Sequence, residues 1–154
     1  MKTFEVPVAD GFVNVRAFFI NLQGSVRVDR PVLEFLNSEN GRFVLGEPFV
    51  CNLDKGAEET SFGELLREGK CLTVSQVCGI LSYLGGEGWG LLDIPSGQEE
   101  VNALIGWILI DGNPCVLYVE HEHEEGKGEE VHLHTAAPGK KEDEPVLVLF
   151  PVLS

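Results

Sequence analysis

The chain has 154 residues, which suits one ordinary domain or two small halves packed together. Hydrophobic residues make up 44% of the sequence and charged residues 23%, so the chain can bury a core and disorder along its whole length is excluded. A formal net charge of −14 argues against direct nucleic-acid binding, and no apolar run reaches the roughly 18 residues of a membrane span.

Residues 1–54 predict a β-rich N-terminal module. Two extended runs meet near Gln23-Gly24, and a turn at Asn37–Gly41 precedes further extended runs around Phe43 and Phe49. Short strands punctuated by Gly, Asn and Pro are typical of a small β-barrel or sandwich. We therefore expect that architecture for this module.

Residues 55–98 predict a helical and Gly-rich connecting segment. Ser61 and Glu64 have the spacing of a capping box at the start of a short helix. A second helix is expected to begin at Thr73 and to end at Gly85-Gly86. Its apolar residues recur at helical spacing: Val74, Val77, Cys78, Leu81 and Leu84. The glycines of 85–98 follow a helix rather than a strand, so we do not expect a phosphate-binding loop there.

Residues 99–154 predict an antiparallel β-meander of about four strands, so the whole chain is expected to be one compact α+β unit that is predominantly β. The last strand is apolar and would leave an edge for homodimerisation. Residues 13–24 align without gaps to 101–112, which indicates either an internal duplication or chance β-strand alternation. The identical pairs are Val13/Val101, Asn14/Asn102, Ile20/Ile108 and Gly24/Gly112.

All four histidines of the chain fall in one predicted hairpin, residues 119–135. Strand residues two apart point to the same face, so two imidazoles at that spacing can bind one ion. The two such pairs, His121 with His123 and His132 with His134, are candidate ligands for zinc, or for nickel or copper.

Whether the two pairs share a face depends on the register of the hairpin. A two-residue turn at Lys127-Gly128, or a four-residue turn at Glu125–Gly128, places all four histidines on one face. A three-residue turn at Gly126–Gly128 separates them into two pairs on opposite faces.

The apolar residues favour the three-residue turn, because Leu117 and Val119 then share a face with Val131 and Leu133. The sequence therefore favours an amphipathic hairpin whose outer face alternates Glu and His. The cross-strand pairs expected in this register are His123 with Val131, His121 with Leu133, His132 with Glu122, and His134 with Glu120.

Other catalytic signatures are weak. The sequence has no Gly-x-Ser-x-Gly elbow, and none of its four cysteines forms a C-x-x-C pair. Cys78 and Cys115 are expected to be structural rather than nucleophilic. Trp89 is expected to pack a loop onto the core, and Asp93 and Asp111 to stabilise turns.

Three functions follow from these observations. The leading expectation is a non-enzymatic, cytoplasmic binding protein that meets a protein partner through its acidic surface or homodimerises through a strand edge. The first alternative is a metal-binding protein or metal-dependent hydrolase that uses His121, His123, His132 and His134. The second alternative is an inhibitor that mimics nucleic-acid charge. No catalytic residue is assigned.

Overall fold

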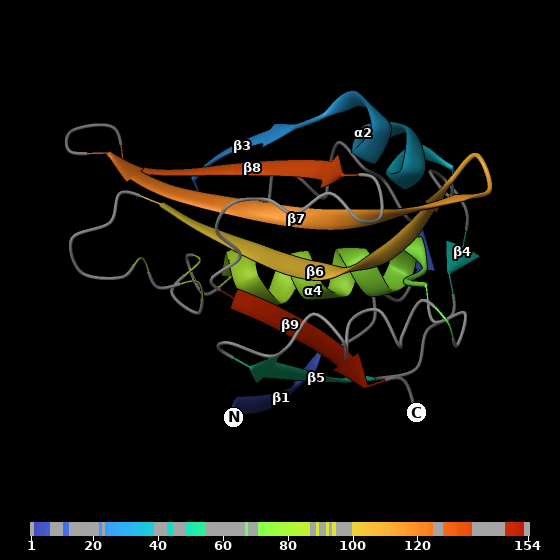
Figure 1. Ribbon diagram of the computed structural model, residues 1–154, viewed down its shortest axis with the longest axis horizontal. Coiled ribbons are helices and arrows are strands. Elements are labelled where there is room, and N and C mark those ends of the chain that lie inside the picture. Colours follow the sequence, from blue (N-terminus) through green and yellow to red (C-terminus); the bar gives the residue numbers. More distant parts are fainter. Residues whose placement is uncertain are drawn as a thin grey trace.

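A computed structural model shows how the elements are arranged in space (Figure 1). The residues that it describes are 2–6, 11–12, 22, 24–38, 43–44, 49–54, 67, 71–86, 89, 92, 94, 100–124, 128–136 and 147–152. They form a mixed α+β fold, as expected, with the helices α2 (Arg30–Asn37) and α4 (Val74–Gly86) beside a large sheet. No helix within these ranges is long and apolar enough to cross a membrane.

The large sheet has seven strands in the order β1-β5-β9-β6-β7-β8-β3 and is open, with β1 and β3 at its edges. Its strands are β1 (Lys2–Val6), β3 (Ser25–Val28), β5 (Phe49–Asp54), β6 (Glu100–Ile110), β7 (Asn113–Glu124), β8 (Gly128–Ala136) and β9 (Leu147–Val152). A separate two-stranded pair consists of β2 (Gly11–Phe12) and β4 (Phe43–Val44).

The N-terminal strands join the C-terminal sheet, so the described residues do not form the separate N-terminal barrel or sandwich that we expected. β1 pairs with β5, β5 pairs with β9, and β3 pairs in parallel with β8 at the other edge. Strands of four to six residues are marginal as isolated pairs. Addition to the large sheet gives their backbone groups partners: β3 pairs with the long strand β8, whereas β1 and β5 are connected to β6 through β9.

The C-terminal strand also departs from the expected meander. β6, β7 and β8 are antiparallel neighbours, as expected, but β9 lies between β5 and β6 and runs parallel to β6. The expected position of the fourth strand is therefore wrong, and β9 is not an edge through which two copies could pair. An almost continuous apolar run such as LVLFPV is typical of an interior strand.

The turn expected at Asp111 is confirmed, and it connects β6 and β7 as a two-residue hairpin. Ile110 pairs with Asn113, and the two residues between them, Asp111 and Gly112, have φ values of 51° and 79°. A type I′ turn requires positive φ at both central positions, which Asp-Gly tolerates well. Of the first segment of the internal echo, the structure describes Leu22 and Gly24, so the duplication stays a prediction; Gly24 is left-handed like Gly112, with φ of 80°.

Helix α2 lies in the module for which we expected short strands and no helix. Pro31 stands in its first turn, where proline's fixed φ favours a helix and its missing N–H costs nothing. Val32 and Leu36 lie four residues apart and are both fully buried, while Arg30 and Glu34 form an exposed ion pair at 3.2 Å. These helical spacings outweigh the β-propensity of the surrounding sequence.

Helix α4 confirms the second helix expected in the connecting segment. The Thr73 hydroxyl accepts the backbone N–H of Gln76, and the Gln76 side chain accepts the backbone N–H of Thr73. This reciprocal capping box satisfies two donors at the helix start. The helix ends at Gly86, as predicted. Of the first expected helix, around Ser61–Gly69, the structure describes only Arg67.

The sheet has two faces with different contents. The inner face packs with α2 and α4 in the main core and carries Val101, Ala103, Ile108, Leu117, Val119, Val131 and Leu133. The outer face carries a smaller apolar cluster: Leu104, Trp107, Val116 and Tyr118. The register of β6 and β7 shifts at a β-bulge at Ile105, so that Leu104 pairs with Tyr118 and Gly106 pairs with Leu117. The polar residues of the candidate site continue along the outer face.

Candidate functional site

The register of β7 and β8 separates the four histidines into two pairs on opposite faces. His121 lies opposite Val131, whereas His132 lies opposite Glu120 and His134 opposite Tyr118. Three residues, 125–127, separate the paired Glu124 from Gly128. The preference for the split arrangement is therefore confirmed, and a single site holding all four histidines is not formed.

The individual cross-strand partners differ from those we expected by two residues. His123 lies opposite Glu129 instead of Val131. The pair next to the turn is Glu124 with Gly128, which is one residue earlier on each strand than a turn at Gly126–Gly128 requires. Gly128 has φ of 77°, so it ends the turn in the left-handed conformation that glycine adopts readily. A two-residue shift preserves the side-chain faces, because strand side chains alternate with a period of two.

His121 and His123 lie on the inner-face side of β7, away from His132 and His134. His121 is only 5% exposed, and its Nδ1 donates a hydrogen bond of 2.8 Å to the carbonyl oxygen of Leu92. That bond joins His121 to Leu92 within the buried core, so His121 has a structural role. His123 is exposed near the end of the strand.

The outer face brings Glu120, His132 and His134 together. One potential ligand atom from each of these residues lies within 4.8 Å of the other two. The imidazole of His134 stacks between its neighbours, with ring centroids 5.1 Å from Tyr118 and 5.0 Å from His132. Nε2 of His134 lies 3.7 Å from a carboxylate oxygen of Glu120. Glu120 thus remains beside His134, diagonally rather than directly across the strand pair.

Two residues from the β3 segment contact both ring nitrogens of His132. Nε2 lies 2.6 Å from the Asp29 carboxylate, and Nδ1 lies 3.2 Å from a guanidinium nitrogen of Arg27. A guanidinium only donates hydrogen bonds, so Nδ1 accepts, and Nε2 donates its proton to Asp29. These two contacts select the tautomer of the neutral imidazole that leaves the lone pair on Nδ1.

The parallel pairing of β3 with β8 places these two partners. Arg27 lies directly opposite His132 in the register, and the Asp29 backbone N–H donates to the Leu133 carbonyl at 2.9 Å. The Asp29 side chain makes no capping bond to α2, although it stands at the N-cap, and is directed at His132 instead. Sequence reasoning missed both partners, because they lie 105 and 103 residues from His132 and no local pattern marks them.

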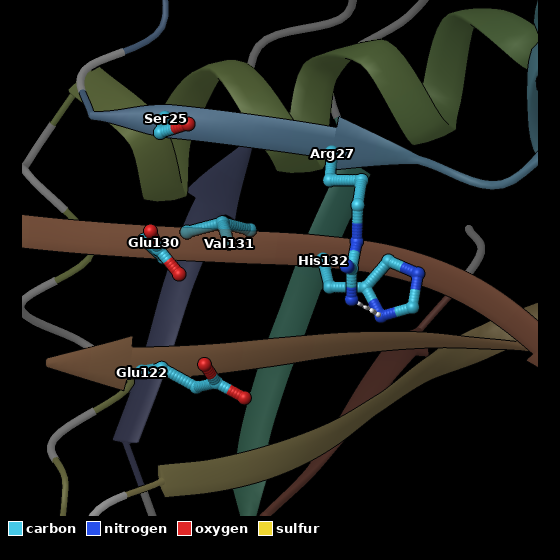
Figure 2. A pocket seen from close by; sticks show the side chains of 6 residues that line it. All are labelled: Ser25, Arg27, Glu122, Glu130, Val131 and His132. Atoms are coloured by element: carbon cyan, nitrogen blue, oxygen red, sulfur yellow. Dashed lines mark hydrogen bonds between the residues drawn. The ribbon is translucent and has the colours of Figure 1, made fainter. Parts of the chain in front are cut away.

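A cavity of about 200 Å³ lies beside His132 on the outer face. Residues of three neighbouring strands line it: Ser25, Arg27, Glu122, Glu130, Val131 and His132 (Figure 2). Glu122 and Glu130 are direct cross-strand partners, an arrangement that like charges disfavour. The cavity therefore adjoins the Glu120–His132–His134 cluster and shares His132 with it.

The remaining candidates have structural roles among the described residues. Burial raises the pKa of the Cys78 thiol to about 12 and also raises the pKa of Cys71, so neither is activated as a nucleophile. Trp89 is fully buried in the main core, as expected for a residue that packs a loop. Asp111 belongs to the β6–β7 turn.

Two imidazoles and one carboxylate form a donor set that zinc and related divalent ions accept, with further positions left for water. The pendant carboxylate of Asp29 adds the outer contact that metal-binding histidines usually make through their second nitrogen. No family model, no curated protein and no solved structure matches this chain.

Proposed function

We propose that this protein binds a divalent transition-metal ion, with zinc as the reference ion, on the outer face of its sheet. Glu120, His132 and His134 would be the ligands. The observation that carries the proposal is the convergence of one ligand atom from each of the three residues within 4.8 Å. His132 also donates a hydrogen bond to a carboxylate, the outer contact that metal-binding histidines usually make.

The geometry requires a modest closure around the ion. Zinc–nitrogen bonds of about 2.0–2.1 Å place ligand atoms around a tetrahedral ion roughly 3.3 Å apart, which is closer than the present 4.8 Å limit. The three side chains remain 12–23% exposed, so they can rotate without repacking the main core. The strand backbone keeps Glu120 and His132 directly opposite each other throughout.

His132 is prepared for coordination through Nδ1. Metal binding requires a neutral imidazole, and the hydrogen bond to Asp29 selects the tautomer with its proton on Nε2. Arg27 occupies the hydrogen-bonding position at Nδ1, so an incoming ion would displace its guanidinium. Arg27 is exposed and can move into solvent.

The test is metal titration of protein purified without an affinity tag, by calorimetry and by competition with a coloured chelator. We expect one ion per chain. Glu120→Gln and His134→Ala should each weaken binding by more than the roughly 10- to 100-fold typical of outer-contact changes. His123→Ala removes an exposed histidine from the opposite side and should leave the affinity unchanged. Sub-stoichiometric binding, or equal losses in His123→Ala, would contradict the proposal.

A second candidate, the acidic interaction protein, is favoured by the charge of the chain. The formal net charge is −14, and the outer face carries Asp29, Glu120, Glu122 and Glu130 against Arg27. Such a field speeds encounters with basic partners. Capture experiments at low and high salt test it, and a nucleic-acid-binding partner would favour the charge-mimicking inhibitor. Absence of any salt-sensitive partner would refute both versions.

A further inference from the structure

The cavity beside His132 has opposite charges at its two ends. Figure 2 shows the carboxylates of Glu122 and Glu130 at one end, and Arg27 beside His132 at the other. Ser25 lies opposite Glu130 in the β3–β8 register and adds a hydroxyl at the acidic end. A ligand that carries only one charge would match only one end of this cavity. A ligand with both charges would satisfy both ends.

The acidic end has the chemistry of an ammonium site. Glu122 and Glu130 are paired directly across β7 and β8, so a positive group between them would meet two carboxylates. An ammonium group has three N–H donors, and this end supplies three acceptors of suitable type: two carboxylates and the Ser25 hydroxyl. The opposite end has a guanidinium, which recognises carboxylates through paired N–H donors.

The spacing between the ends suits a short ligand. Glu130 and His132 are two residues apart on one strand, as are Ser25 and Arg27, so the ends are separated by about 7 Å of backbone. In an α-amino acid the ammonium nitrogen and carboxylate carbon are about 2.5 Å apart. Adding a hydrogen bond of about 2.9 Å at each end gives a span of about 8 Å. A cavity of about 200 Å³ is below the roughly 300–1,000 Å³ typical of pockets for drug-sized ligands.

We infer that this cavity binds a small zwitterion of the α-amino acid class, with its ammonium group between Glu122 and Glu130 and its carboxylate on Arg27. The inference does not rest on the proposed metal site, because none of these contacts requires an ion. A metal ion alone fits the cavity less well, since the guanidinium of Arg27 would repel it. A lysine side chain from a partner would leave Arg27 without a new contact.

The test is NMR titration of the ¹⁵N-labelled full chain in the presence of EDTA, which keeps metal binding out of the measurement. The probes are glycine, L-alanine, methylamine and acetate. Glycine and L-alanine should give saturable shifts of the amides of Ser25, Arg27, Glu130 and His132. Methylamine should bind about tenfold more weakly than glycine, and acetate should give no saturable shift.

Three variants distinguish recognition of both charges from simple cation attraction. Arg27→Gln should weaken glycine binding about tenfold and leave methylamine binding unchanged or tighter, whereas Glu130→Gln should weaken both. Arg30→Gln is the matched control, because it removes an exposed arginine whose partner is Glu34. Equal binding of glycine and methylamine, loss of no affinity in Arg27→Gln, or shifts confined to other residues would overturn the inference.

Discussion

Replacement of Asp29 tests whether the carboxylate behind His132 tunes a metal ligand. Asp29→Asn keeps an acceptor for the Nε2 proton but removes the negative charge, whereas Asp29→Ala removes both. The bond is 2.6 Å long, which is short even for a charge-assisted hydrogen bond. We therefore expect zinc affinity to fall in Asp29→Asn and to fall further in Asp29→Ala.

The magnitude follows from the geometry and exposure of this pair. Hydrogen bonds to charged groups contribute about 1.5–3 kcal/mol. Solvent screening favours the lower end here, since the side chains of His132 and Asp29 are 21% and 45% exposed. A loss of about 1.4 kcal/mol is tenfold in affinity, which we expect for Asp29→Asn, and Asp29→Ala should approach the 100-fold limit of outer-contact effects.

Chelator competition measures the affinities, and thermal unfolding of the metal-free variants provides the stability control. Asp29 makes no side-chain capping bond to α2, so a lower melting temperature of the metal-free variants reports loss of its hydrogen bond to His132 and not loss of a helix cap. Glu34→Gln is the matched variant, because it removes an exposed carboxylate from the same helix. If both Asp29 variants bind zinc within twofold of the unmodified protein, the outer-contact reasoning is refuted.

Three further predictions follow from single contacts. Arg27→Gln should tighten zinc binding about three- to tenfold in the same competition assay, because it removes a competing cation 3.2 Å from the coordinating nitrogen; weaker binding would contradict this. Gly106→Ala should lower the free energy of unfolding in urea by about 1–3 kcal/mol, since its Cβ would lie 2.5 Å from Leu72 Cδ1, whereas Gly86→Ala meets nothing within 4 Å and should cost little. Ionisation of Cys78 should lower the free energy of unfolding by about 1.4 kcal/mol from pH 8 to pH 10. The pKa of its thiol is about 12 in the folded chain and 9.0 in the unfolded chain, so only the unfolded chain ionises in that interval. Cys78→Ala should lack this part of the pH dependence.

The parts of the fold that could be predicted depend on short-range patterns. Asp111 marked the β6–β7 turn, and Thr73 marked the start of α4, where its hydroxyl caps the helix. Each pattern is decided within a few residues by backbone conformation or capping hydrogen bonds. These elements therefore lie where the sequence placed them.

The parts that could not be predicted depend on contacts between distant segments. The parallel pairing of β3 with β8 and the crossover of β9 to β6 leave no periodic signal in either strand alone. Helix α2 did leave local signals, in Pro31 and in the four-residue spacing of Val32 and Leu36, but the surrounding β-like sequence obscured them. The two partners of His132, Arg27 and Asp29, were missed because the pairing of β3 with β8 brings them to His132 from a distant part of the chain.

The histidine hairpin shows which part of a site a sequence determines most firmly. Burial of Val131 and Leu133 selects the face of every residue in β8, because a slip of one residue would expose both side chains to solvent. A slip of two residues keeps them buried, so the hydrophobic effect sets the face without setting the cross-strand partner. The turn decides the partner, and here it brings Glu122 opposite Glu130.

Because the turn and not burial sets the cross-strand partners, it also sets which charges are paired on the outer face. Like charges in direct register disfavour a strand pair, by up to about 1 kcal/mol on the scale of cross-strand pairs, and the register predicts such a cost between Glu122 and Glu130. A bound ammonium group or cation between them would reverse the sign of that interaction, and ligand binding would then raise the stability of the sheet in proportion to ligand concentration. Glu130→Gln separates the two effects: it should stabilise the ligand-free chain slightly and remove most of the stabilisation by glycine. If the variant is less stable than the unmodified chain without ligand, the two carboxylates do not repel each other as their register implies.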